Sequence, residues 1–241
     1  QNTRSDSNNA DVKPVIIKPP DKVGKTSLSV KLKYGTTIKF ASLNCKGIRR
    51  IGKREKTILP ETFNYLLKTT KAKDRSDSIY FISATLKKAI DKIYDPIEGG
   101  FFRYAETADW EVPHFEKMLY DNAMLARVYL HAWKLNSDPR WLQVAEETIE
   151  YVLRDLCDPL GGFYSAEDAD SEGVEGKFYV WEQKELEEIC GDHADEVIEW
   201  YGVTSGGNFE SSNILYRQKV GDLIRPFGVE ESRQILFEKR K

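Results

Sequence analysis

The chain has 241 residues, of which 40% are hydrophobic and 12% aromatic, and its formal net charge is −3. This composition suits a globular protein with a buried core, and no window approaches 18 consecutive apolar residues, which excludes a transmembrane helix. The three cysteines lie far apart and form neither a C-x-x-C motif nor a disulfide framework, and the N-terminal residues lack a signal-peptide core. We therefore expect a cytoplasmic protein without a membrane partner.

The charge is distributed unevenly along the chain. Residues 1–75 contain 18 Lys and Arg against 6 Asp and Glu, whereas the other 166 residues contain 18 against 33. Such a split indicates two regions with different partners. We predict a basic N-terminal segment over residues 1–59 and a helical domain over residues 60–241.

The basic segment is expected to begin with about ten disordered polar residues and to continue with a β-hairpin. Apolar and basic residues alternate from Leu28 to Phe40, with a turn at Gly35 and Thr36. The following run, KGIRRIGKREK, has two interpretations: a ribbon that binds nucleic acid, or a solvated extension. The absence of interleaved aromatic residues makes nucleic-acid binding the weaker one. The nearby sequence VGKTS is no phosphate-binding loop, because Pro19 stands where that motif needs glycine.

Beyond the basic segment, apolar residues recur three and four positions apart, which predicts amphipathic helices. Pro113 and Pro139 are placed for first-turn positions, and Ser137 or Asp138 can cap the second of these helices. The predicted helices cover about residues 79–93, Pro113 to Leu135, Pro139 to Leu156, Gln183–Ile189 and His193–Tyr201.

A glycine-aromatic loop recurs between the helices. The sequence DPIEGGFFRY is followed by DPLGGFYS, with the glycine pairs at Gly99 and Gly161 separated by 62 residues, and a looser echo begins at Gly206. A repeated unit of helix, turn, helix and loop is typical of stacked α-hairpins. In such a stack the repeated loops lie on one face, where a binding site is expected.

His114 is the first candidate for chemistry on this face. If the helix begins at Pro113, His114 and Asp121 share one edge of its buried stripe, where the helix dipole would lower the pKa of the imidazole and favour a neutral base. The alternative is a histidine that only stabilises the start of the helix.

The second candidate is the acidic stretch AEDADSEGVEGK, which holds five carboxylates within nine residues. Carboxylates this close repel one another unless they are protonated, paired or bound to a cation. A calcium loop is disfavoured, because its twelfth position holds Tyr179 instead of glutamate. The wall of a cavity for a sugar or another polar ligand, beside aromatic residues, and a solvated acidic turn both stay open.

The motifs GGFFRY…W.VPHFEKMLYDNA, GGFYSAEDADSEGVEGKFYVW and GNFE..NIL resemble a family of thioredoxin-domain-containing proteins. Its human member is named for spermatogenesis, and its bacterial members carry a domain of unknown function. The resemblance covers roughly residues 60–241. It implies an (α/α)6 toroid similar to N-acylglucosamine 2-epimerases and six-hairpin glycosidases. The family's thioredoxin-like domain has no counterpart in residues 1–59.

The resemblance therefore predicts a mainly α fold in the form of an incomplete (α/α)6 toroid of stacked helical hairpins, preceded by a short basic, β-leaning segment. About 180 residues supply roughly three hairpins where six close the ring. A partial ring exposes apolar surface that a complete ring buries, so self-association is expected.

The implied function is that of a fragment of a carbohydrate-active protein, with little activity by itself and a carbohydrate-like small molecule as partner. In a sugar epimerase or isomerase, His114 would move the proton next to the carbonyl carbon and Asp121 would orient it. Arg103 or Tyr104 would stabilise the oxyanion.

In a glycosidase, the carboxylate pair would come from Asp168 with Asp170 or Glu175. No cofactor and no metal are expected. The alternative function is a non-catalytic helical scaffold that binds a protein or polar ligand through its acidic mouth. Further residues expected to contact the ligand are Trp110, Glu116, Tyr164, Trp181, Asn208 and Glu210.

Overall fold

The computed structural model describes residues 28–31, 37–40, 49–51, 55–57, 75–107, 109–217 and 225–240, with side chains from Ile82 onward. The expectations of disorder in the first ten residues and of side-chain chemistry in the basic segment concern residues outside this part. The α-helices in it are α2 (Arg75–Lys92), α3 (Leu119–Asn136), α4 (Pro139–Asp155), α5 (Gln183–Cys190), α6 (Ala194–Tyr201) and α7 (Phe227–Arg240). Short strands connect them.

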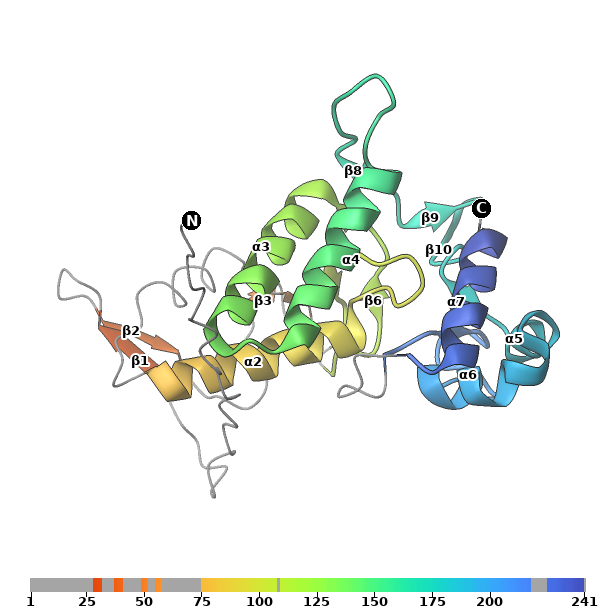
Figure 1. Cartoon of the computed structure of the whole chain (residues 1–241), viewed down its shortest axis with the longest axis horizontal. Helices are drawn as coiled ribbons and strands as arrows, with labels where there is room; N and C mark the ends of the chain where they lie inside the picture. The colour runs from red at the N-terminus through yellow and green to blue at the C-terminus, as the bar shows by residue number, and fades with distance from the viewer. Residues whose placement is uncertain are drawn as a thin grey trace, which may run out of the picture.

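Helices dominate the described part of the chain, as the sequence predicts. Helices α3 and α4 form an antiparallel hairpin that lies across α2, while α5, α6 and α7 gather beside them (Figure 1). Three predicted helices match α2, α5 and α6 closely, and α4 begins where its cap predicts, because the Asp138 side chain accepts a hydrogen bond from the Arg140 N–H. About half of the described residues are helical, in keeping with a mainly α fold, and the incomplete ring stays a prediction.

The predicted N-terminal hairpin is confirmed at the level of the backbone. Strand β1 (Leu28–Lys31) pairs antiparallel with β2 (Thr37–Phe40), with Leu28 opposite Phe40. The sequence analysis did not foresee the next pair, β3 (Arg49–Ile51) and β4 (Glu55–Thr57). Together with β5 (Tyr104–Ala105) and β6 (Pro113–His114) these two strands form a four-stranded sheet in the order β3-β4-β5-β6. Strand β4 of the basic segment thus belongs to the same sheet as His114.

The other strands are two residues long and hold the connecting loops together. They form antiparallel pairs between β5 and β6, β7 and β8, β9 and β10, and β11 and β12. These strands are β5 (Tyr104–Ala105), β6 (Pro113–His114), β7 (Lys117–Met118), β8 (Ala166–Glu167), β9 (Asp170–Ser171), β10 (Val174–Glu175), β11 (Val180–Trp181) and β12 (Asn213–Ile214).

The predicted helix start at Pro113 is wrong. Helix α3 begins at Leu119, and the segment before it contains the strands β6 (Pro113–His114) and β7 (Lys117–Met118). Burial alternates through them: Pro113, Phe115 and Lys117 are buried, and the residues between are partly exposed. This period of two is the β pattern, and the buried lysine hid it from a reading of apolar residues alone. The helix-dipole effect on His114 therefore does not apply.

The repeated glycine-aromatic loops are closed by similar backbone hydrogen bonds, which supports the internal repeat, although the second loop is one residue shorter. The Asp95 N–H donates to Gly100 O at 3.0 Å, and the Asp158 N–H donates to Gly162 O at 3.1 Å. Both pairs of adjacent glycines have positive φ, from +78° to +95°, a region that residues with a Cβ rarely adopt.

Two apolar clusters form the core of the described residues. The first lies between α2, α3 and α4 and includes the fully buried Leu86, Val128 and Val144. The second joins α5, α6 and α7 around Leu186 and Leu236 and reaches the first glycine-aromatic loop through Ile97. No helix among the described residues has the length and apolar character needed to cross a membrane.

Candidate functional site

The β5–β6 hairpin positions His114. Tyr104 lies directly opposite His114 in the register of the two strands. The two rings stack with centroids 4.8 Å apart and planes 15° apart, as expected of an aromatic cross-strand pair. The adjacent Arg103 N–H donates to Glu116 O at 2.8 Å, which joins the hairpin one step further along. The imidazole plane is therefore fixed by the strand pairing.

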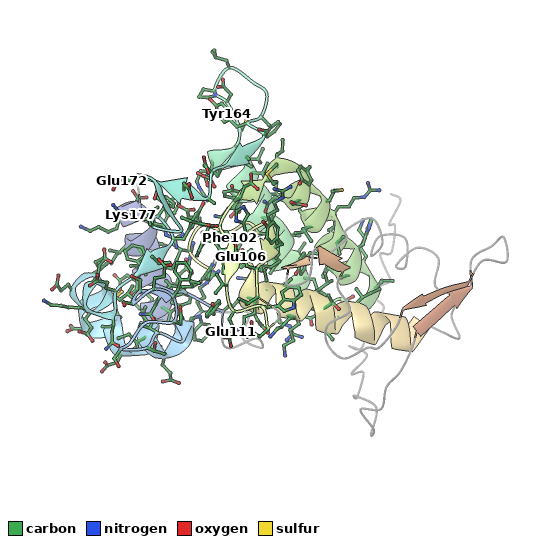
Figure 2. All side chains as sticks on the ribbon, turned by 180° about the vertical axis from the view of Figure 1, so that it is seen from behind. Phe102, Glu106, Glu111, Tyr164, Glu172 and Lys177 are labelled. Carbon is green, nitrogen blue, oxygen red and sulfur yellow. The ribbon has the colours of Figure 1, made fainter. Side chains whose placement is uncertain are left out.

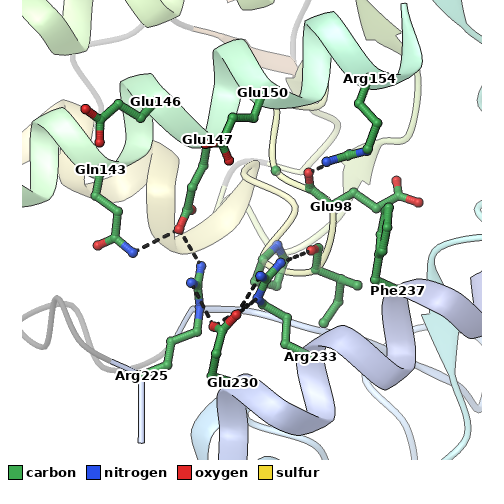
Figure 3. A pocket seen from close by; sticks show the side chains of 13 residues that line it. Glu98, Gln143, Glu146, Glu147, Glu150, Arg154, Arg225, Glu230, Arg233 and Phe237 are labelled. Carbon is green, nitrogen blue, oxygen red and sulfur yellow. Dashed lines mark hydrogen bonds and ion pairs between the residues drawn. The ribbon is translucent and has the colours of Figure 1, made fainter. Parts of the chain in front are cut away.

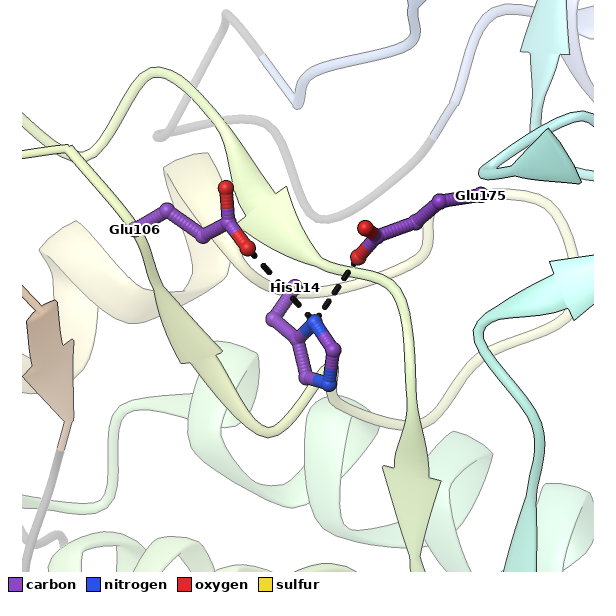
Figure 4. Close-up of side chains that lie close together, drawn as sticks. All are labelled: Glu106, His114 and Glu175. Carbon is purple, nitrogen blue, oxygen red and sulfur yellow. Dashed lines mark hydrogen bonds and ion pairs between the residues drawn. The ribbon is translucent and has the colours of Figure 1, made fainter.

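Three carboxylates lie near the imidazole of His114. Figure 4 shows two of them, those of Glu106 and Glu175. His114 Nδ1 lies 2.8 Å from Glu175 Oε1 and 3.6 Å from Glu106 Oε1. On the other edge of the ring, His114 Nε2 lies 3.7 Å from Glu116 Oε2. That carboxylate forms an ion pair with Arg103 Nη1 at 2.8 Å. Both ring nitrogens thus face carboxylates, one of which is neutralised by an arginine.

Glu175 reaches His114 because the β9–β10 hairpin packs against the strand segment. Glu175 pairs with Asp170 across this hairpin, and Gly176 follows with φ +75°. A Cβ at Gly176 would lie 2.5 Å from the Phe115 ring, so only glycine allows this close approach. The glycine that ends the acidic stretch is therefore what brings its last carboxylate to His114.

The cluster is open to solvent without being fully exposed. The side chain of His114 is 23% exposed, and those of Glu106 and Glu175 are 45% and 42% exposed. A histidine hydrogen-bonded to a carboxylate and reachable from water has the geometry of a general acid or base. An imidazole flanked by carboxylates is also a set of metal-ligand types.

Five of the residues singled out in the sequence come together here. They are the histidine, one acidic-loop carboxylate and three expected ligand contacts: His114, Glu175, Arg103, Tyr104 and Glu116. Their functional roles stay predictions. The sequence analysis missed Glu106, although alternation along the strand from Tyr104 would have placed it on the same face.

Asp121 does not share an edge with His114 in the way predicted. It lies in the first turn of α3, whereas His114 lies in β6, so the two belong to different elements. An acidic residue in a first turn interacts favourably with the helix dipole, which is a structural role. The prediction that the two residues share one helix is therefore wrong, and the orienting role of Asp121 stays a prediction.

Trp110 and Trp181 lie in the core and not at a ligand surface. They are 1% and 4% exposed and belong to the two apolar clusters. Their expected contact with a ligand does not agree with this burial. Aromatic residues at this spacing pack the interior.

The remaining predicted site residues lie in turns of their own. The Asp168 carboxylate accepts a hydrogen bond from the Asp170 N–H at 3.2 Å, and both residues are exposed. Asn208 exchanges hydrogen bonds with the backbone of Ile214, and Glu210 lies in the same turn with φ +46°. Tyr164 stands on the loop that protrudes beyond α4, where its hydroxyl donates to Asp158 (Figure 2).

A buried ionic cluster surrounds Lys117, which follows His114 by three positions in the sequence. The Lys117 Nζ is fully buried and donates to Asp95 Oδ2 at 2.9 Å and Glu98 Oε2 at 3.3 Å. Arg240 of α7 also pairs with Asp95, at 2.8 Å. Burial alone would raise the pKa of Asp95, but Arg240 and Lys117 outweigh it and hold that pKa below its usual range. This cluster fixes the first loop to β7 and α7, which is a structural role.

A cavity of about 420 Å³ lies between the first glycine-aromatic loop, α4 and α7 (Figure 3). Arg225 pairs there with Glu147 at 2.9 Å and with Glu230 at 3.2 Å. Arg233 pairs with the same Glu230 and donates to Ile97 O at 2.8 Å. These charges neutralise one another, and no residue with a predicted role lines the cavity. We therefore place the candidate site at His114.

Sequence comparison identifies relatives named for spermatogenesis. The chain is 38% identical to "Spermatogenesis-associated protein 20" of Homo sapiens over 172 residues, which cover 64% of this chain and 22% of that protein. The Mus musculus protein of the same name gives the same identity and coverage. An uncharacterized protein of Caenorhabditis elegans is 34% identical over 159 residues, covering 57% of this chain and 21% of that protein.

These relatives support the spermatogenesis-associated part of the resemblance. The chain spans only 22% of the length of the human relative, and no family model matches it. The thioredoxin-like domain, the toroid and any activity of the whole protein stay predictions.

Proposed function

We propose that this chain carries part of a binding site for a polyhydroxylated, carbohydrate-like ligand, centred on His114. The observation that carries the proposal is the 2.8 Å contact between His114 Nδ1 and Glu175 Oε1, in a cluster that solvent reaches. The resemblance to toroids that act on sugars indicates the ligand class, by analogy of fold.

The chemistry that fits this pair best is proton transfer at a carbon next to a carbonyl group. When the Nδ1–H donates to Glu175, the unprotonated Nε2 is the atom that accepts a proton from the ligand and returns it. Arg103 would stabilise the oxyanion, and its ion pair with Glu116, which lies 3.7 Å from Nε2, supports this role.

Hydrolysis of a glycosidic bond is less well supported. A glycosidase needs two carboxylates on opposite sides of the bond, one of them protonated. Asp170 and Glu175 pair across the same hairpin, and Asp168 is hydrogen-bonded within its own turn. We therefore propose an epimerase or isomerase mechanism in preference to hydrolysis.

The proposed scaffold is a partial (α/α) toroid. The α3–α4 hairpin and the two equivalent glycine-aromatic loops support stacked hairpins. We also propose self-association through the second loop, because its apolar side chains, Leu160 and Phe163, are 98% and 51% exposed.

The test is a ligand screen on the wild-type chain and on His114→Gln. Neutral hexoses, N-acetylhexosamines and sugar phosphates would be screened by saturation-transfer NMR, and proton exchange in D₂O would be followed for each ligand that binds. We expect binding to weaken roughly tenfold and exchange to fall by roughly 10²-fold or more in the variant.

His193→Gln is the matched control, because His193 also pairs with a glutamate, Glu231, at 3.3 Å, in a different part of the molecule. It should behave as the wild type does. Sugar binding that is the same in His114→Gln and wild type would contradict the proposal. If no sugar binds either protein, the non-catalytic scaffold becomes the better interpretation.

A further inference from the structure

The donor atoms of Glu106, His114 and Glu175 converge on one point in space. One ligand atom from each residue, the imidazole nitrogen and two carboxylate oxygens, lies within 4.8 Å of the others. The three residues come from two strands and the segment after β5, and Glu106 and Glu175 are 69 residues apart in the sequence. We propose that these three side chains bind a divalent transition-metal cation, which goes beyond the proposed function because it requires no sugar.

The spacing of the donor atoms suits a coordination sphere. Bonds of about 2.0–2.2 Å from a metal to nitrogen and oxygen place neighbouring ligand atoms roughly 2.8–3.1 Å apart at octahedral angles and roughly 3.3–3.6 Å apart at tetrahedral angles. His114 Nδ1 lies 2.8 Å from Glu175 Oε1 and 3.6 Å from Glu106 Oε1. The first separation matches the octahedral range and the second the upper end of the tetrahedral range, and the third pair of donor atoms lies within 4.8 Å, so a cation can bind after small adjustments of the two glutamate side chains.

The surroundings of His114 orient it as a ligand. Metal-bound histidines usually present their second ring nitrogen to a carboxylate, which fixes the tautomer. Here Nε2 faces Glu116 at 3.7 Å, and Arg103 holds Glu116 at 2.8 Å. The Tyr104 ring stacks on the imidazole and fixes its plane. This second layer of contacts is independent of the three donor atoms: Glu116 lies at the Nε2 edge of the ring, and Nδ1 is left to face Glu106 and Glu175.

The charge of the site also favours a cation. Two carboxylates facing one imidazole nitrogen repel each other, and a divalent ion would neutralise both. One imidazole and two carboxylates suit Zn²⁺ or Mn²⁺, and three protein ligands leave a coordination position for water or substrate. The partial exposure of the two glutamate side chains, 45% and 42%, leaves room for that position.

Cation binding and proton transfer by His114 exclude each other through the tautomer of the ring. A metal on Nδ1 takes the place of the hydrogen bond to Glu175 and leaves the imidazole proton on Nε2, so Nε2 can no longer accept a proton from the ligand. The bound cation would then polarise a carbonyl or hydroxyl oxygen of the ligand as a Lewis acid.

The experiment is calorimetric titration of Zn²⁺ and, separately, Mn²⁺ into the metal-free full chain near neutral pH. We expect one equivalent of at least one ion to bind the wild type. Affinity should fall roughly 10- to 100-fold in His114→Gln and in Glu175→Gln, and stay unchanged in His193→Gln. Equal thermal unfolding midpoints of the metal-free variants show that loss of binding is local.

Two results would overturn the inference: no binding of either ion at millimolar concentration, or equal binding by wild type and His114→Gln. The latter would place the cation on the acidic hairpin alone. The sugar screen repeated with a chelator separates the two proposals. Sugar binding without cation binding would support the proposed function and contradict this inference. Cation binding without sugar binding would support this inference and contradict the proposed function.

Discussion

The two glycine-aromatic loops have similar local structures and opposite surroundings. Asp95 and Asp158 each accept a hydrogen bond from the N–H two residues later, at 3.0 and 2.8 Å. Yet Ile97 of the first loop is 0% exposed, whereas Leu160 at the equivalent place in the second is 98% exposed. The two loops share the Asp-Pro start, the glycine pair and the following aromatic residue, and the second is one residue shorter. The difference in exposure follows from what covers each loop.

The first loop is covered by α4, α7 and the cluster around Lys117. Arg240 of α7 and Lys117 of β7 both pair with Asp95, and Tyr151 of α4 packs against Gly100. No described atom lies within 4 Å of a Cβ built at Gly162. One motif can therefore be a core element or an exposed surface within a single chain, depending on whether a helix packs on it.

The largest expected effect on stability comes from Asp95→Asn, and Asp158→Asn in the second loop is its matched control. Asp95→Asn leaves Lys117 and Arg240 buried with one carboxylate fewer, which should destabilise the fold by about 3–5 kcal/mol in urea unfolding. Asp158→Asn, on the exposed loop, should leave unfolding unchanged. Similar losses in both variants would show that the second loop is also covered.

The effect of Asp95→Asn should depend on pH. The folded-state pKa of Asp95 is lower than its ordinary value of 3.8, so its contribution is complete above pH 3.8 and is lost as the pH falls through the folded value. The difference from wild type should therefore persist at neutral pH and shrink in acid.

A smaller effect is expected from the glycines. Gly162→Ala adds strain at φ +95° but meets no atom, which should destabilise by about 1–2 kcal/mol. Gly100→Ala has the same strain at φ +78° and places its Cβ 2.5 Å from the Tyr151 ring, so about 2–4 kcal/mol is expected. Urea unfolding gives the loss of stability in each variant, and the difference between the two losses measures the cost of the contact with Tyr151 of α4. Equal losses would contradict the closer packing of α4 on the first loop.

The smallest effect on stability, and the largest on association, is expected at Leu160. Leu160→Asp should change unfolding by less than about 0.5 kcal/mol, because the side chain is exposed. It should weaken self-association roughly tenfold or more in analytical ultracentrifugation, since each buried leucine contributes about 1.5–3 kcal/mol. Phe227→Asp, at a site 79% exposed elsewhere, is the control. Association that is insensitive to Leu160, or equally sensitive to Phe227, would contradict the proposed surface.

Part of the candidate site could be predicted from sequence. His114, Glu175 and Arg103 stood out as reactive residue types in unusual motifs, and they do meet. Their geometry could not be predicted, because His114 and Glu175 are 61 residues apart and meet through a hairpin packed on Phe115. The aromatic residues Trp110 and Trp181 misled the prediction, since composition alone does not separate a core indole from a ligand contact.

The sequence by itself determined what local interactions control. Apolar periodicity set the helices, Asp138 set the start of α4, and the glycine pairs set the shape of both loops. Tertiary structure decided whether residues 113–118 form strand or helix, because those residues gain their hydrogen bonds from distant strands. It also decided which loop is buried and which carboxylates reach His114, since burial and charge pairing depend on elements that are remote in the chain.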